Sequence, residues 1–391
     1  MRLTYKYRLM PTKAQAVFLN GELRDACSLY NAAKQERDDA WKTCHKSINY
    51  YDQANQLKAM RADGCLTLAN FSCCQDVLRR VDKTYKAFYA RVKRGEKPGF
   101  PRYRSARRYD SITFPSYGDG CRLLDNGKLR IQGAGHIKVN LHRPLEGTVK
   151  TVTVKREAGR WFACFSVERA GQPLPASERA TGIDVGLNSF AVLADGTEIE
   201  NPRHYRNAEA RLRRCQRKVA RRKKGGNRRR QAVRLLQRAS IHVRNQRADF
   251  QHKLSRQLVN EYGVIAVEDL QVRNMSRSAK GTIDKPGRNV RAKSGLNRSI
   301  LDAGWSMFVA MLAYKAENAG RRLIEVDPRG TSQTCVCGAS VRKTLADRWH
   351  DCPVCGLSAS RDHVSAQVIL QRSAGNPPSS ANVEVVVSCV A

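Results

Sequence analysis

Three acidic side chains, far apart in the chain, have the residue types and the settings needed for metal-dependent chemistry. Asp184 lies in TGIDVGLNSFAVLADG, Glu268 follows the apolar run VIAV, and Asp362 lies in SRDHVSAQVIL. A buried carboxylate is costly unless it is paired or binds a metal. Two Mg²⁺ ions about 3.5–4 Å apart can activate water and stabilise the leaving oxygen of a phosphodiester. We therefore predict that these acids form one catalytic Mg²⁺ site, with Mn²⁺ as an alternative ion.

Each of these acids also has a purely structural interpretation. Asp362 could stabilise the N-terminus of a helix through the helix dipole, and Glu268 could be a surface charge at the end of a strand. Asp184 is harder to explain in this way, because it stands among apolar residues of a predicted strand. Asp184 is accordingly the expected bridging ligand, with Glu268 and Asp362 each holding mainly one ion.

Four cysteines between the second and third acid have the spacing of a metal site. Cys335 and Cys337 form one pair, Cys352 and Cys355 form a second, and 14 residues separate the pairs. Four thiolates in this arrangement predict a closed, tetrahedral structural Zn²⁺ site. The first pair has one intervening residue instead of the usual two to four. The alternatives are a redox-active cysteine pair, or His350 as a replacement ligand.

The charge balance indicates a polyanionic partner. The chain has 71 Lys and Arg against 35 Asp and Glu, which gives a formal net charge of +36. Such a surplus over 391 residues is typical of an extended nucleic-acid interface. A membrane is the weaker interpretation, because the chain has no run of about 18 apolar residues and no signal-peptide core. Free cysteines without a secretion signal predict a reducing cytoplasm.

Two basic segments are candidate nucleic-acid contacts. Residues 211–256 contain 18 Lys and Arg and one acid, Asp249, which favours phosphate binding over a merely solvated helical face. The segment KPGFPRYR mixes cations with an aromatic ring, as backbone contact and base stacking require, although a solvated basic loop is the alternative. The predicted contact residues are Arg102, Tyr103, Arg104, Arg213, Arg214, Arg217, Lys218, Arg221, Arg222, Lys223, Lys224, Arg228, Arg229 and Arg230.

The elements that must position these residues follow from periodicity and turn signals. The N-terminal half predicts a strand at 2–9, a helical block from 13 to about 95 capped by Thr12, and short β segments at 110–170 that form a small barrel or sandwich with the first strand. The C-terminal half predicts strands at 181–186, 189–194, 264–268 and 322–326, helices within 204–261, a mobile loop at 272–298, a helix with Leu301 and Trp305 on one side, and a last helix at 361–372. The order of the second set is that of an RNase H-like α/β fold.

Several longer motifs resemble those of a known family. They are TGIDVGLNSFAVLADG, VEDL, LDAGWSMFVAMLAYKAENAG, EVDPRGTSQTC, RWHDCPVCGL and RDHVSAQVIL, with KPGFPRYR and MPTKAQ in the N-terminal half. On these motifs the chain resembles the TnpB-type proteins of bacterial insertion sequences, which are related to type V CRISPR effector nucleases. The family often has an asparagine at the position of Val364 and an aspartate at that of Ser360.

The resemblance implies an RNA-guided DNA endonuclease with one RuvC-like site that cuts both strands of double-stranded target DNA beside a short motif. Its guide RNA derives from the transposon end. The implied domains are a wedge-like β-barrel (1–10 and 96–175), a helical recognition lobe (11–95), a RuvC-like nuclease domain (179–330 and 360–374), a zinc ribbon that binds target nucleic acid (331–359) and a flexible tail (375–391). The expected assembly is a monomeric ribonucleoprotein.

Two other functions are compatible with these patterns. A guide-RNA-dependent repressor would bind DNA without cutting it, but such a protein would be expected to lose acids of the site. A DNA strand-joining transposase could use similar acids on the same fold. The presence of all three acids favours the nuclease over the repressor.

Overall fold

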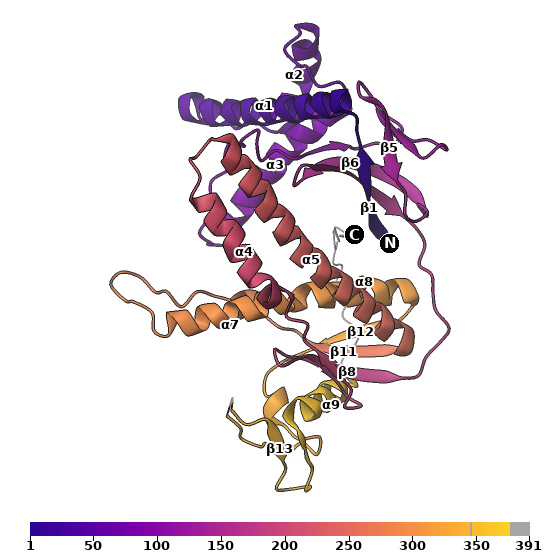
Figure 1. Ribbon diagram of the computed structural model, residues 1–391, viewed down its shortest axis with the longest axis vertical. Coiled ribbons are helices and arrows are strands. Elements are labelled where there is room, and N and C mark those ends of the chain that lie inside the picture. Colours follow the sequence, from indigo (N-terminus) through magenta and orange to yellow (C-terminus); the bar gives the residue numbers. More distant parts are fainter. Residues whose placement is uncertain (345, 376–391) are drawn as a thin grey trace. The chain divides into compact units, whose positions relative to one another are not determined.

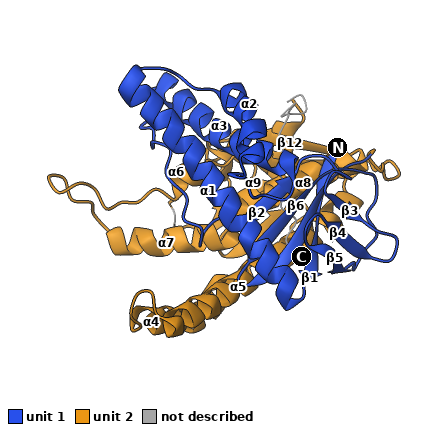
Figure 2. Ribbon diagram, turned by 90° about the horizontal axis from the view of Figure 1, so that it is seen from above, with its two compact units in different colours: residues 1–169, 391 blue, residues 170–390 orange. Residues whose placement is uncertain are grey.

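The computed structural model describes residues 1–344 and 346–375, so that 376–391 of the predicted tail lie outside the described residues. The described residues form two compact units, 1–169 and 170–375 (Figure 2). Both units combine helices with a β-sheet. Within the described part of the chain, no helix is long and apolar enough to cross a membrane.

Three helices follow the first strand of unit 1. They are α1 (Lys13–Cys44), α2 (Tyr50–Ala62) and α3 (Phe71–Lys93). The predicted cap at Thr12 is confirmed: its hydroxyl accepts from the Gln15 amide at 3.3 Å, and the Gln15 side chain accepts from the Thr12 amide at 3.0 Å. This reciprocal capping box satisfies two amides that the first helical turn leaves without partners.

Unit 1 also contains one antiparallel sheet. Its strands are β1 (Arg2–Met10), β2 (Ser111–Phe114), β3 (Cys121–Leu123), β4 (Lys128–Ile131), β5 (Gly135–Asn140), β6 (Thr148–Glu157) and β7 (Arg160–Glu168), in the order β2-β6-β7-β1-β5-β4-β3. The predicted strand at 2–9 is therefore confirmed. It pairs with β5 and β7, two strands that follow the three helices in the sequence (Figure 1).

The prediction of a closed β-barrel is wrong. The strands β2 and β3 form the two edges of the sheet and do not pair, so the sheet remains open as half of a barrel. Its apolar face, including Ile137 and Phe165, shares one buried core with Leu23 of α1 and Leu78 of α3. Because the helices cover this face, the sheet does not have to close on itself to bury it.

Unit 2 is built on a mixed sheet. Its strands are β8 (Ala180–Val185), β9 (Ser189–Leu193), β10 (Glu198–Glu200), β11 (Val264–Glu268) and β12 (Arg322–Val326), in the order β10-β9-β8-β11-β12. The strands β8, β11 and β12 are parallel, whereas β9 and β10 run antiparallel to their neighbours.

The helices of unit 2 cover both faces of this sheet. They are α4 (His204–Ala220), α5 (Asn227–Glu261), the short α6 (Val272–Met275), α7 (Val290–Ala303), α8 (Trp305–Ala319) and α9 (Arg361–Ser373). Ile183 and Ile265 share a core with Phe308 of α8, while Ala266 shares a separate core with Ile369 of α9. Successive strand side chains point to opposite faces, so α5 and α8 lie on one side and α9 on the other (Figure 1).

Two sequence-based expectations in this unit are wrong. The predicted loop at 272–298 contains α6 and the first turns of α7. The predicted helix with Leu301 and Trp305 on one side is divided at Gly304, whose φ of 69° ends α7 before α8 begins. The break re-aims the chain, so that Leu301 is 57 % exposed whereas Trp305 is buried.

The cysteine segment between β12 and α9 has little regular structure. It contains a single 3₁₀ turn, η1 (Thr331–Gln333), and a two-stranded antiparallel sheet of β13 (Trp349–Asp351) and β14 (Ser358–Ser360). The strand β14 runs directly into α9. The segment thus follows β12 in the chain and continues directly into α9.

Candidate metal and nucleic-acid sites

Asp184 and Glu268 lie side by side at the carboxyl ends of neighbouring strands. The register of β8 and β11 pairs Ile183 with Val267, so the next residue on each strand brings Asp184 beside Glu268. Ile183 and Val267 point into the core under α5 and α8. Because side chains alternate along a strand, both carboxylates point to the opposite face, which α9 covers.

Gly182 explains how the third acid reaches the other two. A Cβ built on Gly182 would lie 2.1 Å from the backbone oxygen of Ala366, so the backbone of α9 crosses β8 in direct contact with this glycine. Asp362 lies one helical turn before Ala366, and Asp184 lies two residues beyond Gly182 on the same face of the strand. The close crossing therefore places the first turn of α9 over the carboxyl end of β8.

The pKa of Asp184 depends on its burial and on the charges of the other two acids. Burial raises the pKa of Asp184 to about 8; the negative charges of Glu268 and Asp362 add to this effect, and the Arg361 guanidinium opposes it. Burial also raises the pKa of Glu268, while the Thr331 hydroxyl and the positive charge of Arg372 oppose that shift. The arrangement concentrates negative charge that a cation would stabilise.

Two further side chains form hydrogen bonds to the acids: Thr331 of the cysteine segment and Arg361 of α9. The Thr331 hydroxyl donates to Glu268 Oε1 at 2.5 Å. The Arg361 Nε donates to Asp362 Oδ1 at 3.3 Å, and its Nη1 donates to the carbonyl oxygen of Asp347 at 3.0 Å. The start of the cysteine segment thus contacts Glu268, and Arg361 of α9 connects Asp362 to Asp347 within the segment.

These residues fit a divalent cation. Carboxylate oxygens are the preferred protein ligands of Mg²⁺, which retains water and substrate oxygens in its remaining positions. All three acids are partly exposed, so that an ion can reach them from solvent. Burial and then the charges of Glu268 and Asp362 raise the pKa of Asp184, and a bound cation would offset both effects. The structure therefore brings the predicted residues to one face of the sheet, and their chemistry suits a metal site, although their carboxylate oxygens do not all lie within 4.8 Å of one another.

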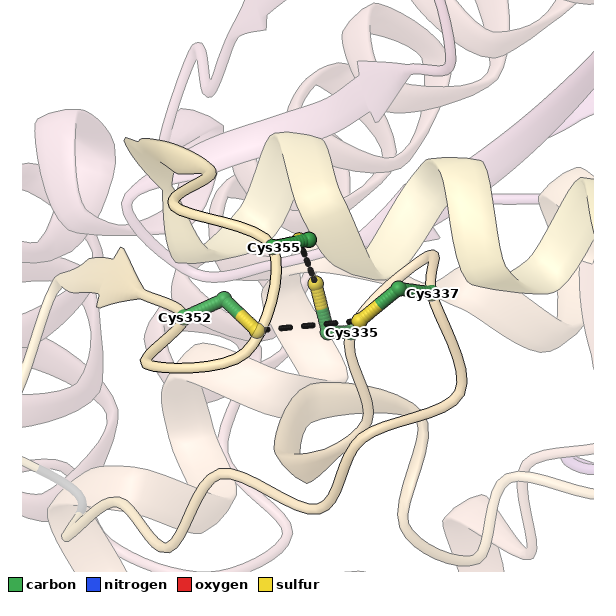
Figure 3. A group of neighbouring side chains, drawn as sticks. All are labelled: Cys335, Cys337, Cys352 and Cys355. Atoms are coloured by element: carbon green, nitrogen blue, oxygen red, sulfur yellow. Dashed lines mark hydrogen bonds between the residues drawn. The ribbon is translucent and has the colours of Figure 1, made fainter.

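The four predicted cysteines converge as well (Figure 3). Their ligand atoms all lie within 4.8 Å of one another, which makes them the one such group of three or more among the described residues. The Cys335 and Cys355 sulfurs are 3.6 Å apart, and those of Cys337 and Cys352 are 3.7 Å apart. His350 is not part of the group: it is buried, and its Nδ1 pairs with Lys343.

The sulfur spacing fits a tetrahedral zinc site. With Zn–S bonds of about 2.3 Å, the edge of a regular tetrahedron is about 3.8 Å, close to the observed separations. A disulfide would require a sulfur separation of about 2.05 Å, and all four cysteines are free. Backbone amides of Cys355 and Val354 lower the pKa of the Cys352 thiol, whereas burial raises the pKa of the Cys335 thiol. Both Cys335 and Cys337 reach the cluster, although only one residue separates them.

The predicted basic helices form a cationic groove. It has a volume of about 730 Å³, and six of its lining side chains are cations. Five of the predicted residues line it: Arg214, Arg217, Lys218, Arg221 and Arg222, together with Arg211, Cys215 and Leu235. This groove offers a dense row of donors that suits a phosphate backbone.

Other predicted basic residues have partners within the protein. Arg229 Nη1 donates to the carbonyls of Val219 and Arg222 at 2.6 and 3.0 Å and so closes the end of α4. Arg213 pairs with Glu209 at 2.9 Å, and Arg230 donates to Asn227 at 3.0 Å. The remaining predicted residues of the turn, Lys223, Lys224 and Arg228, are exposed.

The segment around Tyr103 is docked on α1. Asn31 accepts from the Arg104 amide at 2.8 Å and donates to the Arg104 carbonyl at 2.9 Å. Lys34 lies 4.0 Å from the centroid of the Tyr103 ring. This ring is 50 % exposed and Arg102 is exposed as well, so both side chains remain accessible on a fixed backbone.

Sequence reasoning missed the residues that position the acids. A glycine inside a strand is a known sign of close backbone approach, and this signal could have identified Gly182. Thr331 and Arg361 carry no such signal, because their roles depend on which distant residues they contact.

Three protein-family models match parts of the chain. Residues 149–279 match "Probable transposase" of the OrfB IS605 type, residues 305–369 match the "Cas12f1-like, TNB domain", and residues 1–46 match a "Helix-turn-helix domain". In the structure, residues 1–46 contain β1 and the single helix α1.

Curated relatives match almost the whole chain. The "Putative RNA-guided DNA endonuclease InsQ" of Escherichia coli K12 is 32 % identical, covering 94 % of this chain and 91 % of the relative. The "Putative RNA-guided DNA endonuclease" of Streptomyces pristinaespiralis is 32 % identical, covering 95 % and 89 %. The solved mini-RNA-guided endonuclease CRISPR-Cas phi3 is 11 % identical with a TM-score of 0.47, covering 97 % of this chain and 93 % of that one. The chain belongs to the TnpB family of OrfB proteins of IS605-type insertion sequences.

Proposed function

We propose that this chain is an RNA-guided DNA endonuclease of a transposable element, which cleaves DNA beside a short motif at one site. The observation that carries the proposal is the meeting of Asp184, Glu268 and Asp362 on one face of a sheet in a chain of net charge +36. The names of the two relatives, both RNA-guided DNA endonucleases, support it. Such a protein would act in the bacterial cytoplasm on the nucleoid, as a monomeric ribonucleoprotein.

In the proposed reaction the protein supplies a fixed set of oxygen ligands. The charges of Glu268 and Asp362 both act on Asp184, so its carboxylate suits a shared ligand, and each of the other two acids would complete one side. Bound Mg²⁺, or Mn²⁺, would activate water and stabilise the leaving 3′ oxygen. Arg361 holds Asp362 through its contact at 3.3 Å. The sheet and α9 thus keep the ligands in place before substrate arrives, which lowers the cost of ordering them during the reaction.

The arrangement of unit 2 supports an RNase H-like, RuvC-type nuclease domain over 179–330 and 360–374. Its order β10-β9-β8-β11-β12, in which only β9 runs antiparallel to the other strands, is the order expected of that fold. In open α/β sheets, ligands bind outside the carboxyl ends of the parallel strands, which is where Asp184 and Glu268 lie. In unit 1, the half-barrel (1–10 and 96–175) and helical lobe (11–95) would read the adjacent motif.

The cysteine segment is the proposed zinc ribbon, 331–359. Its four sulfurs fit a structural Zn²⁺, and its sequence continues into α9 at Asp362. A ribbon at this position would hold target DNA near the acids. The family model that matches 305–369 supports this assignment.

The cationic groove of α4 and α5 is the proposed binding site for the phosphates of the guide RNA. Replacing Arg217 by Ala should weaken RNA binding and reduce the slope of log affinity against log salt by about 1, because one phosphate contact and its counterion release are lost. Arg206, also on α4 but outside the groove, provides the matched control. Binding of the labelled co-purified RNA in a salt series measures both. Equal slopes for Arg217→Ala, Arg206→Ala and the parent would exclude the groove.

The function is tested by the RNA that co-purifies with the expressed protein. We expect its sequence to contain a transposon-end segment followed by a variable guide. The complex should linearise a plasmid that carries the guide-matched target, in the presence of Mg²⁺, and leave an unmatched plasmid intact.

The two alternative functions predict different products. Tight binding of the matched target with no cleavage at any divalent-ion concentration would indicate a repressor. Joined DNA ends formed without RNA would indicate a transposase. Either result would overturn the proposed endonuclease.

A further inference from the structure

Thr331 is a buried residue that contacts Glu268 and has no role in the proposed reaction. Its side chain is 4 % exposed, although it belongs to a segment with few buried residues. The hydroxyl lies 2.5 Å from Glu268 Oε1 and 3.1 Å from the carbonyl oxygen of Pro328. A hydroxyl has one proton, so it can donate to only one of these acceptors at a time. An ionised carboxylate is the stronger acceptor, and the shorter contact is the one to Glu268.

The backbone that carries Thr331 is fixed independently of this contact. Arg372 on α9 donates through Nη1 to the carbonyls of Asp327 and Arg329, at 3.0 and 2.7 Å. The Thr334 hydroxyl donates to the carbonyl oxygen of Gly330 at 2.8 Å. The turn from 327 to 334 is thereby attached to α9, which also carries Asp362. Glu268 is consequently held by a rigid neighbour and not by a mobile loop.

The direction of this hydrogen bond matters for a metal ligand. A carboxylate that binds a cation must be ionised and correctly rotated, and an outer hydrogen-bond donor can fix its rotation before the ion arrives. Donation to Oε1 selects one orientation of Glu268, so its other oxygen does not have to be ordered when a cation binds. Removing such an outer-shell partner typically reduces metal affinity by about 10- to 100-fold.

We propose that Thr331 is a positioning residue that orients Glu268 to bind the divalent cation, and that it connects the ribbon containing Cys335 to the metal site. The proposal rests on the proposed function only in taking Glu268 as a metal ligand. It adds a residue outside the three acids, from a different part of the fold.

The test is Mn²⁺ binding by the full chain, washed free of RNA at high salt and followed by calorimetry. Thr331→Val keeps the size of the side chain but removes the hydroxyl, and we expect it to weaken Mn²⁺ binding by about 10- to 100-fold. Thr331→Ser restores the hydroxyl and should bind within about threefold of the parent. Thr43→Val, the same change at an exposed residue of α1, should bind as the parent does.

The outcomes separate this proposal from the function on which it rests. Asp184→Ala defines the binding that remains without the site; if it binds Mn²⁺ as the parent does, the carboxylate site itself is wrong. If Asp184→Ala loses binding but Thr331→Val does not, the site is correct and the role of Thr331 is wrong. If Thr331→Val proves misfolded by its melting temperature, Thr331→Ala removes the hydroxyl without a methyl group facing Glu268, and parent-like affinity in that variant overturns the proposal.

Discussion

Replacing Asp184 by Asn is expected to abolish DNA cleavage while RNA binding stays nearly unchanged. The change removes the charge of the central ligand and keeps the size of its side chain. Metal stabilisation of developing charge contributes several kcal/mol, which at 1.36 kcal/mol per factor of ten corresponds to a loss of about a thousandfold or more. A cleavage time course on guide-matched plasmid, with RNA retention measured on the same samples, provides the check.

The same variant should be more stable than the parent when divalent cations are absent. Burial and the neighbouring carboxylates raise the pKa of Asp184 from 3.8 to about 8. Between these values the folded state binds one proton more than the unfolded state, so the stability of the parent falls as the pH rises from about 4 to 8. Asn does not titrate, so the stability of the variant relative to the parent should increase over this pH range. Each kcal/mol of added stability should raise the melting temperature by about 2–4 °C.

Asp284→Asn is the matched control, since Asp284 is exposed and lies in the same unit as Asp184. It should leave both cleavage and the pH dependence of melting unchanged. Equal cleavage by the Asp184→Asn variant and the parent would remove the site assignment. A melting temperature that falls in the Asn variant at pH 8 would instead show that Asp184 has a stabilising partner.

The acids could be predicted from the sequence because each lies in a segment with a strong local signal. VIAVE is apolar and β-branched up to its last residue, and TGIDVG places a carboxylate within a strand. The register that sets Asp184 beside Glu268 could not be predicted, because a parallel pair is brought together by contacts remote in the sequence. The contact of Gly182 with Ala366 has the same origin: it depends on how α9 crosses the sheet.

The errors in the fold have a common physical cause. Alternation along β4 and β5 correctly indicated half-buried strands, but it does not say whether a second sheet face or a helix covers their apolar side. In this chain Leu23 and Leu78 of the helices provide that cover, and the sheet remains open. Similarly, the cations and glycines of 272–298 suggested a loop, whereas tertiary contacts such as Lys293 Nζ with the Met275 carbonyl, at 2.7 Å, stabilise the start of α7.

Replacing Cys352 by Ser is expected to release zinc and unfold the ribbon. Among the described residues of 331–360, only Thr331, Cys335, His350 and Cys352 are buried. Four side chains cannot form an apolar core, so the metal would supply most of the folding free energy of this segment. We expect the zinc content to fall from about one ion per chain to near zero, and limited proteolysis to cut within the ribbon while the rest of the chain stays intact.

Cys44→Ser, at an exposed free cysteine outside the cluster, is the control and should retain its zinc. An unchanged zinc-to-protein ratio in Cys352→Ser would exclude the cluster as the zinc site. The consequence for catalysis follows from two contacts. Thr331 of the ribbon contacts Glu268, and Arg361 of α9, which contacts Asp362, also donates to the Asp347 carbonyl in the ribbon. Unfolding the ribbon should therefore weaken divalent-cation binding as well as target binding, whereas a ribbon that served only to hold DNA would leave Mn²⁺ affinity unchanged.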